Sequence, residues 1–233
     1  MQAILGLFFS LVKHFFIKEY SIVKKILLFI SNGSELLEIS PFVDVFGWNS
    51  VISKFKNIKL ITASYGESVN ATWNLKIKSE INLEKHNIDV DEYEGIIIPG
   101  GFGFKGFFED IKKEEFKNLL KIFYKKNKII IGVCTGAIAL LEAGILKNKK
   151  ATTYLLDNKR YFDQLKNLGA IPIEKNIVID ENIITTSNPN SAMIIALYLL
   201  KKLSSKKNME NISYNMGYSY LNSEIEKINN EIY

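Results

Sequence analysis

The chain has 233 residues, 47% of them hydrophobic, which is enough for one α/β domain with a sizeable core and is unlike a disordered composition. Its net charge is +5, and nearly all of the positive charge comes from lysine, because Arg160 is the only arginine. This scarcity argues against nucleic acid as a partner, since guanidinium groups favour bidentate contacts with bases and phosphates. The single cysteine excludes an internal disulfide and a cysteine-rich metal site, and it fits a reducing, cytoplasmic compartment.

Residues 1–22 form an apolar N-terminal extension of uncertain status. The apolar run from Ala3 to Val12 is too short to span a bilayer before Lys13, and it lacks the basic start and the cleavage site of a secretory signal. Three interpretations stay open: an amphipathic helix at a membrane surface, a helix that packs on a partner, and a start codon placed too far upstream. The last two are favoured, so a membrane is not the expected partner.

The core is predicted to begin at Lys24 with a continuous apolar strand. A turn that contains Gly33 follows, and it leads to Glu38 at the start of a helix. Pro41 is predicted to lie in the first turn of that helix, a position that suits proline. The predicted buried stripe of the helix consists of Val43, Val45, Phe46 and Val51.

The middle of the chain alternates between strand and helix patterns. Strands are predicted at residues 58–63 and 95–99, and an amphipathic, lysine-rich helix at residues 114–126. The second strand ends in Gly100 and Gly101. Backbone N–H groups in such a turn can converge on an anion or a developing oxyanion, although a glycine pair more often only marks the end of a strand.

The only cysteine lies where a strand pattern changes into a helix pattern, in Gly132-Val133-Cys134-Thr135-Gly136. This G-x-nucleophile-x-G form places the central side chain at the carboxyl end of a sheet, beside the N–H groups of a helix start. The position is expected to lower the pKa of the Cys134 thiol and so to activate it as a nucleophile. The alternative is a small buried hydrophobic residue, which is a common fate of a lone cysteine.

The C-terminal part continues the alternation. It is predicted to contain a helix at 159–168, a β-hairpin of 176–179 with 183–186, and a final helix at 190–203. Residues 205–233 are expected to be a polar tail, with at most a short helix around Ile212, Met216 and Tyr220. The pattern as a whole predicts one domain over residues 23–204, with a mostly parallel sheet covered on both faces.

Three motifs in this order resemble the ThiJ/PfpI superfamily, a branch of the class I glutamine amidotransferase-like fold. They are Gly33-Ser34-Glu35-Leu36-Leu37-Glu38 with Val43-Asp44-Val45, then Ile98-Pro99-Gly100-Gly101, and then Gly132-Val133-Cys134-Thr135-Gly136-Ala137. The resemblance runs from about residue 24 to residue 203 and continues through 151–154 and 183–187. It implies a three-layer α/β/α sandwich, flavodoxin-like, with a nucleophile elbow.

The resemblance also implies a set of site residues. Cys134 matches the nucleophilic, oxidisable cysteine, and Glu38 matches the carboxyl group that hydrogen-bonds its sulfur. A carboxyl group beside a thiolate is expected to keep its proton, because two adjacent anions raise one pKa. The alternative for Glu38 is a helix-start charge that interacts with the dipole. The oxyanion and substrate-binding positions are Gly100, Gly101, Thr135 and Tyr154.

Two departures from the family pattern bear on the reaction. Thr135 stands where peptidase-like members have a histidine after the cysteine, and Tyr154 stands where other members place one after the next strand. His14 and His86, the only histidines, fall in no catalytic motif. An intracellular cysteine peptidase is therefore the weakest of the functions considered.

The elbow also resembles the isonitrile hydratase branch, through Cys134-Thr135-Gly136 and Ala151-Thr152-Thr153, although the counterpart of Glu38 there is an aspartate. The expected function is a cofactor-independent cysteine enzyme acting on small electrophiles, either glyoxalase- or deglycase-like or hydrating an isonitrile. The alternative is a redox-sensing stress-response protein that works through oxidation of Cys134. No metal or organic cofactor motif is visible, the expected partner is a small electrophilic substrate, and a homodimer is left open because family members often pair.

Overall fold

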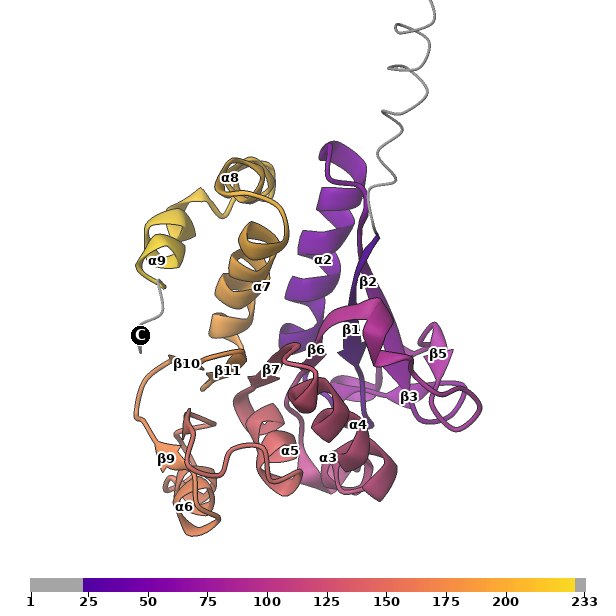
Figure 1. Cartoon of the computed structure of the whole chain (residues 1–233), viewed down its shortest axis with the longest axis vertical. Coiled ribbons are helices and arrows are strands. Elements are labelled where there is room, and N and C mark those ends of the chain that lie inside the picture. Colours follow the sequence, from indigo (N-terminus) through magenta and orange to yellow (C-terminus); the bar gives the residue numbers. More distant parts are fainter. Residues whose placement is uncertain (1–22, 229–233) are drawn as a thin grey trace, which may run out of the picture.

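A computed structural model describes residues 23–228, so the predicted N-terminal extension lies outside the described residues. Figure 1 shows a twisted central sheet with helices on both of its faces. The strands of this sheet are β1 (Lys24–Phe29), β2 (Ile58–Ser64), β5 (Ile81–Asn82), β6 (Tyr93–Ile98), β7 (Ile129–Val133), β10 (Ile177–Asp180) and β11 (Ile183–Thr186). The predicted strands and the hairpin of β10 with β11 are confirmed.

The main sheet has the strand order β10-β11-β7-β6-β1-β2-β5. All neighbouring strands are parallel except β10 and β11. Two small sheets lie outside it: β3 (Val69–Asn70) pairs with β4 (Lys76–Ile77), and β8 (Lys150–Ala151) pairs with β9 (Ile171–Pro172). The chain therefore has the predicted α/β/α, mostly parallel architecture.

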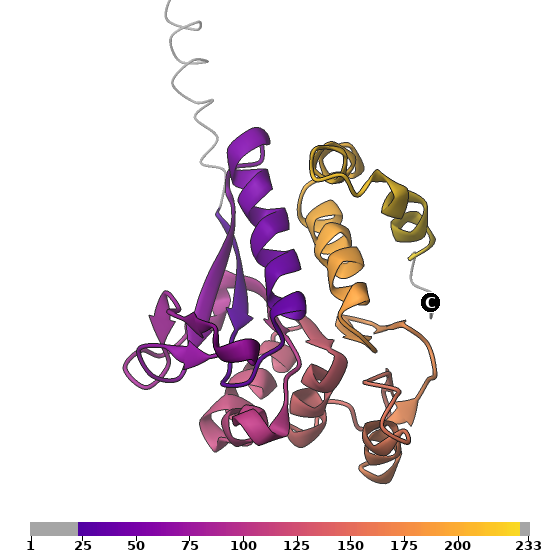
Figure 2. The same ribbon diagram turned by 180° about the vertical axis from the view of Figure 1, so that it is seen from behind.

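The helices form two layers, which Figures 1 and 2 show from opposite sides. One layer contains α2 (Leu36–Ile52), α7 (Asn190–Leu203), α8 (Lys206–Asn215) and α9 (Asn222–Lys227). The other contains α3 (Phe107–Ile111), α4 (Glu114–Lys125), α5 (Ala137–Glu142) and α6 (Arg160–Asn167). Each layer packs on its own face of the sheet, so residues 23–228 contain two hydrophobic clusters, one on each face.

Strand β1 shows why the sheet is buried on both faces. Ile26 and Leu28 point into the cluster under α2 and α7, whereas Leu27 and Phe29 point into the cluster under α4 and α5. Successive side chains of a strand alternate between faces, so a continuous apolar run supplies both clusters at once.

Helix α2 begins earlier than predicted. The Glu35 side chain accepts a hydrogen bond from the Leu37 N–H and caps the helix, so Pro41 lies inside it and not in its first turn. The stripe that is buried consists of Ile39, Phe42, Val45, Phe46 and Asn49. Val43 and Val51, predicted to be buried, are 43% and 70% exposed, because they lie outside the stripe that the helical spacing of residues 39, 42, 45, 46 and 49 buries.

Residues 205–228 contribute to the core, unlike the expected polar tail. Met209 and Ile212 of α8 and Ile225 of α9 are fully buried in the same cluster as α7. Tyr220, expected to help pack a short helix here, is 71% exposed. Among residues 23–228, no helix combines the length and the apolar character that a bilayer crossing requires.

Candidate active site

Three loops meet at the carboxyl ends of β1, β6 and β7. Glu38 follows β1 in the first turn of α2, Gly100 follows β6, and Cys134 follows β7. The strand order reverses between β6 and β1, and in open parallel sheets ligands bind outside the carboxyl ends of the strands at such a point. The fold therefore brings together the residues that the sequence assigned to the site.

The nucleophile elbow is present as predicted. A 3₁₀ turn, η4 (Cys134–Gly136), joins β7 to α5, and Cys134 has a φ of +53°. A Cβ at Gly132 would lie 2.9 Å from the backbone of Ala137, and one at Gly136 would overlap the carbonyl oxygen of Ile98. Both positions need glycine because neighbouring backbone passes against them.

A threonine pair from the neighbouring segment holds the elbow in place. The Thr153 hydroxyl donates to the Cys134 carbonyl oxygen at 2.9 Å, and the Thr152 N–H donates to Thr185 Oγ1 at 2.9 Å. All of these groups are buried. The 151–154 motif therefore supports the positive φ at Cys134, which is costly for a residue other than glycine.

The loops after β1 and β6 are joined through their backbones. The Glu35 N–H donates to the Gly100 carbonyl oxygen at 2.8 Å, and the Phe102 N–H donates to the Gly33 carbonyl oxygen at 3.0 Å. Gly33 adopts a φ of +69°, which glycine tolerates without strain. These bonds place the first turn of α2 beside the diglycine turn.

The Glu38 carboxyl group is almost completely buried, with 1% of the residue exposed. Its Oε2 accepts a hydrogen bond from the Gly100 N–H at 2.6 Å. Burial raises the pKa of Glu38 to about 8, although the bonds from Gly100 and Cys134 act in the opposite direction. Glu38 therefore keeps its proton at neutral pH, in the direction expected from the sequence.

The Cys134 thiol does not behave as expected. Burial first, and then the negative charge of Glu38, raise its pKa well above the usual value, while the hydrogen bond from the Thr135 N–H only partly offsets them. Only 8% of Cys134 is exposed, so the loss of hydration outweighs the stabilising effect of the helix start. The prediction that the elbow lowers the pKa of the Cys134 thiol is therefore wrong, because the burial of the thiol raises this pKa by more than the helix start lowers it.

The predicted oxyanion donors, the N–H groups of Gly100, Gly101 and Thr135, all have hydrogen-bond partners within the site. The Thr135 N–H hydrogen-bonds the Cys134 sulfur. The Gly101 N–H donates to Thr135 Oγ1 at 2.9 Å, and this hydroxyl donates to the Gly101 carbonyl oxygen at 3.0 Å. An oxyanion at Gly101 would have to replace the Thr135 hydroxyl, and the N–H of Gly100 is already bonded to Glu38.

A cavity of about 940 Å³ opens above this cluster. Its lining consists of Glu35, Glu38, Gly101, Phe102, Gly103, Phe104, Phe108, Cys134, Thr135, Tyr154, Asp157, Arg160, Tyr161 and Pro189. Every predicted site residue except Gly100 is in this set. No histidine of residues 23–228 lines the cavity, since His86 borders a separate one, and His14 lies outside the described residues.

The sequence interpretation missed the contribution of the start of α6 and of the loop before it. Arg160 Nη2 lies 2.8 Å from Asp157 Oδ2 and donates to the Tyr161 hydroxyl at 2.9 Å. The guanidinium group also lies 4.6 Å from the centroid of the Tyr161 ring. The sequence offers one signal for Arg160, which is that it is the only arginine of the chain. No pattern in the neighbouring sequence indicates that this segment lines the same cavity as Cys134.

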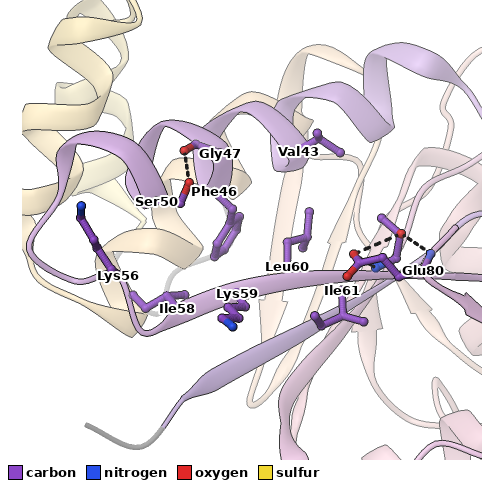
Figure 3. Close-up of a pocket in the computed structure, with 11 residues that line it drawn as sticks. Val43, Phe46, Gly47, Ser50, Lys56, Ile58, Lys59, Leu60, Ile61 and Glu80 are labelled. Atoms are coloured by element: carbon purple, nitrogen blue, oxygen red, sulfur yellow. Dashed lines mark hydrogen bonds between the residues drawn. The ribbon is translucent and has the colours of Figure 1, made fainter.

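A second cavity, of about 330 Å³, lies between α2 and β2 and is drawn in Figure 3. Val43 and Phe46 point into it from α2, and the Ser50 hydroxyl donates to the Gly47 carbonyl oxygen at 2.7 Å. It shares no lining residue with the Cys134 cavity. It therefore offers control positions that are separate from the candidate site.

The fold and the site together define a class: a flavodoxin-like α/β protein with a cysteine on a nucleophile elbow and a neutral carboxyl group against its sulfur. Residues 24–202 match the model of the DJ-1/PfpI family, and the chain belongs to this family. The ThiJ/PfpI resemblance drawn from the three motifs is thereby confirmed.

Three relatives show the range of the family. The chain is 34% identical to an uncharacterised protein of Methanocaldococcus jannaschii over 66% of this chain and 70% of that one. It is 27% identical to the glutathione-independent glyoxalase DJ-1 of Schizosaccharomyces pombe over 84% of this chain and 97% of that one. A solved structure of Schizosaccharomyces pombe DJ-1 superposes with a TM-score of 0.68 and 25% identity, covering 82% of this chain and 98% of that one. It is 30% identical to the isonitrile hydratase of Pseudomonas putida over 58% of this chain and 54% of that one.

Proposed function

We propose that the chain is a cysteine-dependent enzyme acting on small electrophiles, with 2-oxoaldehydes as its first substrates. The observation that carries this proposal is the buried pair of Cys134 and Glu38, hydrogen-bonded to each other at the floor of a large cavity. The relative named as a glyoxalase supports it, because the alignment covers nearly all of that protein.

The protonation of the pair suggests how the thiol is used. Cys134 Sγ forms a bond to the aldehyde carbon while its proton passes to Glu38, and Glu38 gives its own proton to the carbonyl oxygen. The product is a neutral hemithioacetal. Because both groups hold their protons at neutral pH, this relay needs no free thiolate in the resting enzyme.

The remaining steps need no external oxidant. A proton moves from the former aldehyde carbon to the neighbouring carbon through an enediol, with Glu38 as the shuttle, and a thioester of a 2-hydroxy acid results. One carbon is oxidised as the other is reduced. Water then cleaves the C–S bond, which releases the acid and restores the thiol. In these steps the Thr135 N–H donates a hydrogen bond to the oxygen on the carbon bonded to sulfur. The Gly101 N–H donates to the same oxygen once it has released the Thr135 hydroxyl.

The same pair could act on an isonitrile, and the Pseudomonas putida relative supports this second version. Cys134 would add to the terminal carbon, Glu38 would protonate the adduct, and water would displace the thiol to leave an N-substituted formamide. A redox sensor is less well supported, because oxidation requires the thiolate, whose formation is opposed by a raised pKa and by burial.

Turnover of methylglyoxal and of an isonitrile by matched variants tests the proposal. We expect Cys134→Ala to abolish activity and Glu38→Gln to lower kcat by about 100-fold or more, since the proton relay is lost. Ser50→Ala, in the second cavity, is the control and should leave kcat unchanged. Activity that survives in Cys134→Ala would reject the mechanism.

A further inference from the structure

Aromatic rings make up a large share of the wall of the Cys134 cavity. The rings that line it belong to Phe102, Phe104, Phe108, Tyr154 and Tyr161. They come from two segments of the chain: residues 102–108 follow β6 and run into α3, and residues 154–161 lead from β8 into α6. Aromatic rings prefer offset or edge-to-face neighbours, so a wall of this kind favours a ligand that carries a ring of its own.

Two of these rings continue into an exposed row. The Phe102 and Phe104 rings meet edge to face with centroids 5.5 Å apart, and Trp73 meets Phe102 in the same way at 6.0 Å. Phe102 is 38% exposed, Trp73 is 72% exposed and Phe104 is 80% exposed. Folding therefore gains little from the Phe104 side chain, because most of its apolar surface stays in water.

The backbone of the segment needs its glycines but not its phenylalanines at 102 and 104. A Cβ at Gly101 would lie 2.5 Å from the Gly33 carbonyl oxygen, and one at Gly103 would lie 2.7 Å from the Phe108 ring. No comparable constraint requires an aromatic side chain at Phe102 or Phe104. The rings at these two positions are better explained by something that enters the cavity than by the fold.

The size and the charges of the cavity agree with a ligand larger than a three-carbon aldehyde. Cavities of about 300–1,000 Å³ hold ligands of drug-like size, and this one has about 940 Å³. Of the residues that the structure describes, Arg160 is the only one with a cationic side chain in the lining. Its Nη2 is bonded to Asp157 and Tyr161, and among residues 23–228 its other N–H groups have no hydrogen-bond partner, so they are available to a carboxylate.

We propose that the cavity selects electrophiles that carry an aromatic ring on the carbon next to the reacting carbon, with Phe102 and Phe104 as the residues that determine this specificity. The conversion of such a compound rests on the proposed function, whereas the preference of the cavity for an aromatic ring does not. An aromatic 2-oxoaldehyde is the substrate class, and the matching product is an aryl 2-hydroxy acid. In the bound product the ring lies against Phe102 and Phe104, and the carboxylate lies within reach of Arg160.

Binding of three acids to Cys134→Ala, measured by calorimetry, tests this specificity without turnover. The acids are mandelate, hexahydromandelate and lactate, which share the 2-hydroxy carboxylate and differ in an aromatic ring, a saturated ring and a methyl group. We expect mandelate to bind about tenfold more tightly than lactate and more tightly than hexahydromandelate. Adding Phe104→Ala or Phe102→Ala should weaken mandelate binding about fivefold and leave lactate binding unchanged.

The control is Tyr214→Ala, since Tyr214 is an equally exposed aromatic residue, 74% exposed, on α8 and outside the cavity lining. Equal affinities for mandelate and lactate would overturn the proposal. So would a Phe104→Ala variant that binds mandelate normally but loses a self-association seen by sedimentation, because the rings would then serve a subunit contact. If mandelate binds as expected and the intact enzyme turns over no 2-oxoaldehyde, the proposed reaction fails and the binding specificity stands.

Discussion

Glu38 is the residue whose environment differs most from that of an exposed carboxyl group. It lies in the first turn of α2 and is 1% exposed, with one oxygen bonded to the Gly100 N–H. Desolvation is the largest influence on it and raises its pKa from 4.5 to about 8. A group that holds its proton through the neutral range can both donate and accept one, as the proposed relay requires.

The raised pKa of Glu38 makes folding stability depend on pH. The folded protein keeps the proton up to about pH 8, whereas the unfolded chain loses it near pH 4.5. Stabilisation by the protonated form is complete below pH 4.5 and is lost as the pH rises towards 8, by at most about 5 kcal/mol. We therefore expect the free energy of unfolding, measured in urea, to fall over this range in the wild type.

Glu38→Gln provides the comparison, because its side chain stays neutral at every pH. The difference in unfolding free energy between wild type and variant should favour the wild type most at low pH and shrink as the pH rises to about 8. Parallel stability curves for the two proteins would contradict the pKa that burial gives to Glu38.

At the scale of elements, the elbow depends on close backbone contacts between neighbouring segments. Gly132 meets the backbone of Ala137, and Gly136 meets the carbonyl of Ile98 at the end of β6. The same contacts that place Cys134 at the floor of the cavity thus leave no space for a Cβ at Gly132 or Gly136. The G-x-C-x-G pattern is therefore a packing requirement of β6, β7 and α5 as well as a mark of the chemistry.

A pair of glycine substitutions tests this requirement. Gly136→Ala should destabilise the protein by about 2 kcal/mol or more, because the backbone of Ile98 must move to admit the methyl group. Gly47→Ala on the exposed side of α2, where a Cβ meets nothing within 4 Å, should instead stabilise it by about 0.5–1 kcal/mol through helix propensity. Thermal unfolding of both variants measures the contrast, and equal shifts would refute it.

At the scale of the whole molecule, the helical layer over one face of the sheet extends beyond α7. Helices α8 and α9 pack against α7 and bury Met209, Ile212 and Ile225 completely. Asn208 joins this region to the end of α2, through hydrogen bonds to Ser53 at 2.6 Å and to Asn49 at 2.8 Å. The last helices are therefore part of the same folding unit as the sheet.

The contribution of α8 to stability can be measured with two substitutions on the same helix. Ile212→Ala should lower the free energy of unfolding by about 2–4 kcal/mol, because it leaves a cavity in the core. Tyr214→Ala, at a position that is 74% exposed, should change it by less than about 0.5 kcal/mol. A small effect of both would mean that α8 is not part of the cooperative unit.

The sequence by itself determined the alternation of strands and helices, the parallel sheet and the position of the elbow. These features depend on apolar runs, helical spacing and glycine positions, all of which are local along the chain. The pairing of Glu38 with Cys134 was reached only through the family resemblance, since nothing local joins two residues so far apart in the chain.

Only the tertiary structure decided the state of the thiol and the wall of the cavity. The pKa of Cys134 follows from desolvation by segments that are distant in sequence, and that effect outweighs the local influence of the helix start. Arg160 and Phe104 reach the cavity because separate loops converge at the carboxyl ends of the strands. Local pattern specifies each element, but burial and charge at the site depend on how all of the elements pack.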